Sequence, residues 1–167
     1  MGARKYNNIK IGDYIHNNQL AEVKIRYIGK TPNEERLLNS LQVFDVLIGL
    51  FNPDTIALTE DFFILLLNRA NKCLGWFRVS SGGTSGVCVD VKIIMVLALK
   101  TNAHGIILCH NHPSGSLVPS SCDISITEHI CVAAKLFDIT VYDHIIVTPD
   151  KQYFSFADAS MLKIPTK

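Results

Sequence analysis

The sequence predicts an α/β fold in which helices cover both faces of a mixed β-sheet. Short apolar runs that suit strands alternate along the chain with longer segments whose apolar residues recur at helical spacing. This order is typical of α/β domains. A polar turn at residues 68–71 also separates two of the strand-like runs, which predicts a hairpin and therefore at least one antiparallel pair in the sheet.

The length and composition suit one domain. A chain of 167 residues can bury roughly 70% of its unfolded surface, and its 48% hydrophobic content is that of an ordinary globular protein. Residues 1–20 mix Asn, Lys, Gly and Asp with little periodicity. We therefore expect a poorly ordered arm at residues 1–20 and the folded domain at residues 21–167.

The first half of the chain predicts three strands and one helix. Residues 22–28 alternate polar and apolar side chains, as a half-buried strand does, and Ser40 is the expected N-cap of a helix that ends near residue 52. The continuous apolar run at residues 61–68 predicts a central strand buried on both faces, and residues 73–79 predict its hairpin partner.

The second half continues the alternation. Residues 80–86 form a Gly-rich segment without either phosphate-binding glycine motif, and we expect a flexible loop beside a cleft. The elements expected after it are a helix from the N-cap Asp90 to residue 100, a buried strand at 104–109, a helix at 123–137, a strand at 139–147 and an edge strand at 153–156.

Charge and composition argue against several classes of function. The formal net charge of +1 gives no electrostatic footprint for nucleic acid or for an anionic membrane. No apolar run approaches the 18 or so residues of a membrane span, and no signal-peptide pattern follows the first residues. Five scattered cysteines without a C-x-x-C pair predict reduced, mostly buried thiols, so we expect a cytoplasmic protein.

The stretch from Cys109 to Asp123 concentrates more chemistry than any other part of the chain. His110 and His112 are two residues apart in an extended segment, so both side chains point the same way and can reach one ion. Zinc commonly takes a third ligand from a carboxylate, and Asp123 supplies one if residues 113–119, which hold two prolines and a glycine, turn back. Three protein ligands with one open position are what a catalytic zinc site requires.

Each of these residues also has a simpler interpretation. A loop histidine is usually a polar surface group, and Asp123 would serve equally well as a cap of the helix that follows it. We favour the metal site because all three residues occur together in an unusual loop that follows a buried strand. Cys109 and Cys122 are near enough to be considered as ligands, but we expect both to be packing residues.

The spacing His-x-His-Pro, six residues, then Ser-x-x-Asp resembles the metal-binding signature of the JAB1/MPN/Mov34 (JAMM) metalloproteases. The longer string HNHPSG resembles the RadC group within that superfamily, and the likeness extends over about residues 22–160. It implies the JAB/MPN architecture, which is related to that of cytidine deaminases. The helix-hairpin-helix segment that often precedes this domain is not visible, so we expect the short form.

The resemblance also implies roles for individual residues. His110, His112 and Asp123 would bind Zn²⁺, and a water in the fourth position would be the nucleophile. Glu60, just before a buried strand, matches the family's general base and acid, with the neighbouring Asp61 as a competing assignment. Ser120 matches the serine whose hydroxyl would stabilise an oxyanion.

His144, which follows Asp143 in a predicted strand, has two interpretations. It could orient a metal ligand, but such a histidine more often has a structural role. We therefore leave His144 out of the expected site.

The resemblance implies zinc-dependent hydrolysis of a peptide or isopeptide bond in a peptide or protein substrate. The RadC name adds an association with DNA repair, which the near-neutral charge does not support. The physiological substrate and the oligomeric state stay open.

Three alternatives belong to other classes. A catalytically silent JAB/MPN binding module is the first. A metal-dependent nuclease is the second, although the residues of the HNH nuclease motif are spread over a ββα unit rather than adjacent. A zinc deaminase is the third, and the P-C-x-x-C ligand pair that it needs is missing.

Overall fold

The computed structural model describes residue 27, residues 36–82 and residues 88–162. The arm expected at residues 1–20 lies outside the described residues, as do all but one residue of the strand expected at 22–28 and most of the Gly-rich loop. Among the described residues no helix is both long and apolar enough to cross a bilayer.

The described residues form one mixed sheet of five strands in the order β2-β1-β3-β4-β5. β3 and β4 are parallel, and the other three neighbouring pairs are antiparallel. The strands are β1 (Asp61–Leu67), β2 (Cys73–Ser81), β3 (Gly105–Asn111), β4 (Thr140–Val147) and β5 (Tyr153–Ser155). Since β2 continues through Ser81, it takes in the first residues of the expected Gly-rich loop.

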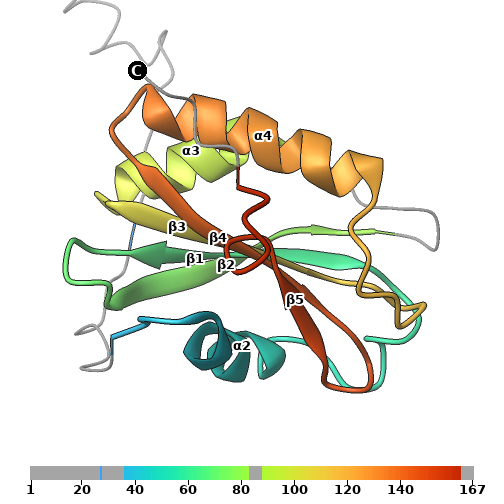
Figure 1. Cartoon of the computed structure of the whole chain (residues 1–167). Coiled ribbons are helices and arrows are strands. Elements are labelled where there is room, and N and C mark those ends of the chain that lie inside the picture. The colour runs from blue at the N-terminus through green and yellow to red at the C-terminus, as the bar shows by residue number, and fades with distance from the viewer. Residues whose placement is uncertain (1–26, 28–35, 83–87, 163–167) are drawn as a thin grey trace, which may run out of the picture.

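In the part of the chain that the structure describes, three helices cover the two faces of this sheet. They are α2 (Ser40–Ile48), α3 (Val91–Lys100) and α4 (Ser121–Lys135). α3 and α4 lie on one face, and α2 lies on the other (Figure 1). The α/β class, the mixed sheet and the covering of both faces are therefore confirmed.

The helix starts follow from capping side chains. Asp90 caps α3 as expected, because its carboxylate accepts a hydrogen bond from the backbone N–H of Lys92 at 2.9 Å. Ser40 is not the cap of α2, so that expectation is wrong. Asn39 is the cap, with its side chain accepting from the N–H of Gln42, and Ser40 is the first helical residue.

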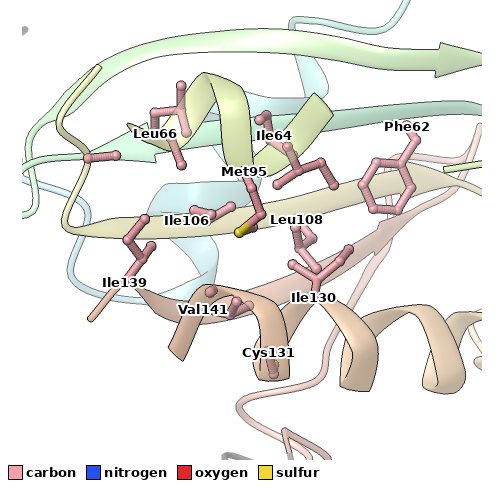
Figure 2. Packing of buried hydrophobic residues seen from close by; sticks show 14 residues of the cluster. Phe62, Ile64, Leu66, Met95, Ile106, Leu108, Ile130, Cys131, Ile139 and Val141 are labelled. Carbon is pink, nitrogen blue, oxygen red and sulfur yellow. The ribbon is translucent and has the colours of Figure 1, made fainter. Parts of the chain in front are cut away.

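The core consists of two clusters separated by the sheet. Side chains of β1 alternate between them, because successive residues of a strand point to opposite faces. Phe62, Ile64 and Leu66 pack beneath α3 and α4 with Ile106 and Leu108 of β3, as Figure 2 shows. The intervening residues of β1 pack against α2. This alternation decides which face each residue of the site occupies.

The cysteines follow the expectation only in part. All five are free, and Cys109 and Cys131 are buried, but Cys88 and Cys122 are exposed. The expectation that Cys122 packs in the core is therefore wrong. Cys122 lies in the first turn of α4 on its exposed side, next to the buried Asp123.

Candidate metal centre

The end of β3 positions the two histidines. His110 is 1% exposed and lies on the sheet face covered by α3 and α4, where its ring stacks on Phe62 at a centroid distance of 6.0 Å. His112 follows the last residue of β3, and its backbone N–H donates to the carbonyl of Val147 in β4 at 2.9 Å. This bond continues the β3–β4 alignment past the strand end, so both imidazoles are held at the same edge of the sheet.

The segment after His112 turns the chain back toward α4. Gly115 has a φ of +78°, a conformation that side chains other than glycine rarely adopt, and its N–H donates to the carbonyl of His112 at 3.0 Å. The Nδ1 atom of His112 lies 2.7 Å from the carbonyl oxygen of Ser116. These contacts show the return turn that the prolines and glycine of the segment predict.

The first turn of α4 positions the carboxylate through a capping box. Ser120 is the N-cap, and its hydroxyl oxygen accepts from the N–H of Asp123 at 3.1 Å. In return the N–H of Ser120 donates to Oδ2 of Asp123 at 2.7 Å. The carboxylate therefore caps its helix and faces the histidines at the same time, so the simple interpretation and the metal interpretation are compatible.

The three predicted ligands converge. One ligand atom from each of His110, His112 and Asp123 lies within 4.8 Å of the other two. Nε2 of His110 is 2.9 Å from Nε2 of His112 and 3.2 Å from Oδ1 of Asp123, and Nε2 of His112 is 3.4 Å from Oδ2 of Asp123. A tetrahedral ion with bonds of ~2.0–2.1 Å would separate its ligand atoms by about 3.3 Å. The residues present therefore fit one small divalent ion.

Hydrogen bonding determines which nitrogen of His112 is free. The carbonyl of Ser116 can only accept, so Nδ1 of His112 carries the proton of the neutral ring. The lone pair of the neutral ring is then on Nε2, the atom that faces Asp123. The contact with the Asp123 carboxylate raises the pKa of His112, partly offset by burial.

The proton position on His110 is determined in the same way, by hydrogen bonds that run through Thr127 and His144. The hydroxyl of Thr127 donates to the backbone carbonyl of Asp123 at 2.5 Å, so its oxygen must accept from Nδ1 of His144, 2.6 Å away. Burial holds the pKa of His144 well below its usual range, so the ring is neutral and its Nε2 accepts. Nδ1 of His110, 2.8 Å from this atom, is the donor, and Nε2 of His110 is left with a lone pair.

His144 therefore belongs to the site, and sequence reasoning placed it outside. Its backbone N–H donates to Oδ1 of Asp143 at 2.7 Å, and its ring lies between Phe156, stacked at 4.8 Å, and Phe62 at 5.5 Å. The signal in the sequence was a histidine in a strand after an aspartate. What it could not show was the parallel pairing of β4 with β3, which brings two residues 34 positions apart into contact.

Asp123 is the electrostatic centre of the group. Burial raises the pKa of its carboxyl group, but the close contacts with His110 and His112, followed by the hydrogen bond from Ser120, outweigh burial and hold the pKa well below its usual range. Asp123 is therefore ionised at neutral pH. An anionic oxygen beside two imidazole lone pairs is a donor set suited to zinc.

Glu60 immediately precedes β1 and is half-buried. The alternation along β1 places it on the face of Phe62 and His110, whereas Asp61 belongs to the opposite face. Burial raises the pKa of Glu60, and the charges of His110 and Asp123 act on it in opposite directions. The carboxylate of Asp61 instead lies 3.9 Å from Arg78 of β2. This geometry favours Glu60 over Asp61, and the base role of Glu60 stays a prediction.

Comparison with known proteins gives one family match. The sequence model of the family described as "RadC-like JAB domain" matches residues 38–161. These residues include the whole sheet, the three described helices and the cluster of His110, His112 and Asp123.

Curated relatives agree with this match. A UPF0758 protein of Flavobacterium johnsoniae is 46% identical over 99 residues, which cover 59% of this chain and 43% of that protein. A UPF0758 protein of Porphyromonas gingivalis is 43% identical over 103 residues, 62% of this chain and 45% of that protein. The UPF0758 protein YfjY of Escherichia coli is 39% identical over 103 residues, 62% of this chain and 64% of that protein. The chain thus spans about half the length of these relatives, whose names state no activity.

Proposed function

The chain belongs to the family of RadC-like JAB domains, and on that premise we propose that it is a zinc-dependent hydrolase that cleaves a peptide or isopeptide bond. The observation that carries the proposal is the convergence of Nε2 of His110, Nε2 of His112 and the carboxylate of Asp123, with both imidazole lone pairs directed into the group. Three ligands leave one position open, as catalytic zinc sites do.

The donor set favours zinc over harder ions. Ca²⁺ and Mg²⁺ prefer oxygen ligands, whereas two imidazoles and one carboxylate suit zinc. Zinc bound by His110, His112 and Asp123 would polarise the scissile carbonyl and lower the pKa of a coordinated water to about 7.

Glu60 is the proton carrier in this proposal. Its carboxylate takes a proton from the attacking water as the water oxygen bonds to the carbonyl carbon. The same proton then passes to the amine nitrogen as the C–N bond breaks, which returns Glu60 to its ionised form. A pKa raised by burial supports this role, because a carboxyl group that titrates nearer to neutral pH accepts and returns a proton more readily.

Ser120 is the residue that we propose for oxyanion stabilisation. Its oxygen accepts the N–H of Asp123 in the helix cap, and this bond does not use the hydroxyl proton. The hydroxyl can therefore cap α4 and donate to an oxyanion beside Asp123.

We also propose a cytoplasmic location, supported by the five free cysteines. The association with DNA repair that the RadC name carries is a separate proposal.

Metal analysis and product analysis on the same samples test the function. We expect about one zinc per chain in the parent protein and loss of that zinc in the His110→Ala, His112→Ala double variant. Zinc-loaded protein is then incubated with a mixture of peptides and with an isopeptide-linked model conjugate, and new amino termini are identified by mass spectrometry. Cleavage that disappears in Glu60→Gln at equal zinc content supports the proposal.

The other outcomes separate the alternatives. Equal zinc in the double variant would overturn the metal site. Zinc binding without cleavage of any substrate would favour a binding module, and cleavage of DNA by the same zinc-loaded samples would favour a nuclease. Cleavage that survives in Glu60→Gln would place the base elsewhere.

A further inference from the structure

Asn111 lies between the two histidines of the site, yet its side chain belongs to the other face of the sheet. Alternation along β3 places His110 beneath α3 and α4, and Asn111, like Cys109, on the side of α2. The residue is 0% exposed. A fully buried amide is costly unless its polar atoms are all paired, so its partners show what it holds in place.

These partners lie on both sides of Glu60. Oδ1 of Asn111 accepts from the N–H of Asp61 at 2.7 Å. Nδ2 donates to the carbonyl of Thr59 at 2.8 Å and to the carbonyl of Ile56 at 2.7 Å. The carbonyl of Thr59 belongs to the peptide group before Glu60, and the N–H of Asp61 belongs to the peptide group after it. One side chain therefore holds both peptide groups that flank Glu60.

The backbone carbonyl of Glu60 itself is also hydrogen-bonded. This carbonyl accepts a hydrogen bond at 2.8 Å from the N–H of Gly82, the residue that follows the end of β2. Glu60 stands one residue before β1. Without these bonds the segment that carries the carboxylate would be an unsupported strand end, and strand ends fray.

We propose that Asn111 is a positioning residue that fixes Glu60 relative to the two histidines on either side of Asn111 itself. The inference rests on the proposed function, because it assigns to Asn111 the placement of the proposed base. The backbone of residues 110–112 carries two proposed ligands on one face. On the other face it carries the Asn111 side chain, whose three hydrogen bonds we call the Asn111 clamp. Three consecutive residues therefore determine how far the proposed base lies from the two histidines.

The chemistry of the clamp requires an amide. It must offer one acceptor to an N–H and two donors to two carbonyls, and only the side chains of Asn and Gln carry both a carbonyl oxygen and an NH₂ group. Aspartate would place a carboxylate against the carbonyls of Ile56 and Thr59, and serine has a single proton to donate.

Asn68 provides a matched control. It lies just after the opposite end of β1, and its Oδ1 accepts from the N–H groups of Ala70 at 2.8 Å and Lys72 at 3.1 Å. Asn68→Ala therefore also removes side-chain bonds to the backbone at an end of β1, but far along the strand from Glu60. An effect specific to Glu60 must appear in Asn111→Ala and not in Asn68→Ala.

Amide hydrogen exchange of the metal-free proteins is the first measurement. In Asn111→Ala the N–H of Asp61 should exchange about tenfold faster, as expected for the loss of one hydrogen bond. The N–H of Gly82, which donates to the carbonyl of Glu60, should also exchange faster as this segment loosens. The N–H of Ile64 in the middle of β1 should not change. If Asn111→Ala does not fold, Asn111→Ser serves in its place, because a hydroxyl keeps some polarity in the buried site. Unchanged exchange at Asp61 would overturn the clamp.

The second measurement uses Co²⁺ as a spectroscopic probe, with no substrate. Cobalt-loaded parent protein, Glu60→Gln, Asn111→Ala and the double variant are titrated with acid and base while the visible absorption is recorded. We expect Glu60→Gln to shift the titration midpoint, Asn111→Ala to shift it in the same direction, and the double variant to show no additional shift. Asn68→Ala should titrate like the parent protein.

The outcomes are distinguishable. A parent-like titration in Asn111→Ala would show that Asn111 does not act through Glu60, and loss of cobalt from Asn111→Ala and Asn111→Ser would show that it supports the ligands instead. Either result overturns the inference while the proposed function stands. Failure of the parent protein to bind cobalt would overturn the proposed function, and the inference would fall with it.

Discussion

The Nδ1 atom of His110 lies 2.8 Å from the Nε2 atom of His144. The direction of this hydrogen bond is determined by Thr127, which contacts the other ring nitrogen of His144. The hydroxyl of Thr127 donates its proton to a backbone carbonyl, so His144 must donate to Thr127 and accept from His110. A buried backbone carbonyl of α4 thereby selects the tautomer of an imidazole in the sheet. Partners of this kind tune the affinity of a site without touching the ion.

Replacing His144 should weaken metal binding. His144→Phe keeps a ring between Phe62 and Phe156 but removes the acceptor for His110, and we expect zinc affinity to fall roughly 10–100-fold. Competition against a fluorescent chelator measures the affinity. His129→Ala, which removes an exposed histidine of α4, is the control and should bind zinc like the parent protein. Parent-like affinity in His144→Phe would show that the contact does not orient His110.

Removing Ser120 should cost both stability and activity. Ser120→Ala loses the cap of α4, and we expect the free energy of unfolding in urea to fall by about 1 kcal/mol. Asn39→Ala loses the cap of α2 and should destabilise the protein by a similar amount. Peptide-bond cleavage by zinc-loaded protein should fall in Ser120→Ala alone. Equal activity in the two variants would restrict Ser120 to its structural role.

The raised pKa of Glu60 predicts a pH-dependent gain in stability from Glu60→Gln in the metal-free protein. A carboxyl group whose pKa is higher in the folded state than in the unfolded state favours folding below its unfolded pKa, about 4.5, and this contribution is lost as the pH rises through the folded pKa. Glutamine does not ionise. Glu60→Gln should therefore be more stable than the parent protein at pH 7, with a smaller difference at pH 4.

Urea titrations of the two metal-free proteins between pH 4 and pH 8 measure this difference. A constant difference across that range would show that the environment of Glu60 does not disfavour its charge. The same property sets the acid limit of activity. Cleavage by the zinc-loaded parent protein should decline as the pH falls through the pKa of Glu60, because the base must be ionised to accept a proton.

Gly115→Ala should destabilise the return turn without a steric clash. The added methyl group would meet no atom within 4 Å, but φ at this position is +78°, which costs an alanine about 1–2 kcal/mol. Gly75→Ala in β2 also meets no atom within 4 Å and lacks the positive φ, so it should be close to neutral. Thermal unfolding of both variants gives the comparison. Equal effects would mean that the conformation of Gly115 is not under constraint.

The central strands and the grouping of His110, His112 and Asp123 could be predicted from the sequence because their signals are local. The apolar run of β1 is continuous, and the spacing of His110, His112 and Asp123 is compact. The cap of α2 was assigned to Ser40 instead of Asn39 because both residue types cap helices well. The difference between two adjacent capping residues depends on backbone angles that the sequence does not display.

The contacts that support the site could not be predicted, because they depend on how distant strands are aligned. Asn111 and Asp61 are 50 positions apart in the sequence. They meet only because Phe62 pairs with His110 in the register of β1 and β3. His144 meets His110 only because β4 runs parallel to β3. A slip of one residue in either register would turn every one of these side chains to the opposite face.

Helix α4 is attached to the proposed metal centre twice, by the Asp123 carboxylate and, one turn later, by Thr127. Undocking of α4 from the sheet would therefore remove an anionic ligand and release the His110 tautomer in a single event. In the proposed site, metal binding and the docking of α4 would form one cooperative equilibrium, because an ion bound only by the docked state stabilises that state. The concentration of available metal would then set the fraction of molecules in which α4 is docked on the sheet.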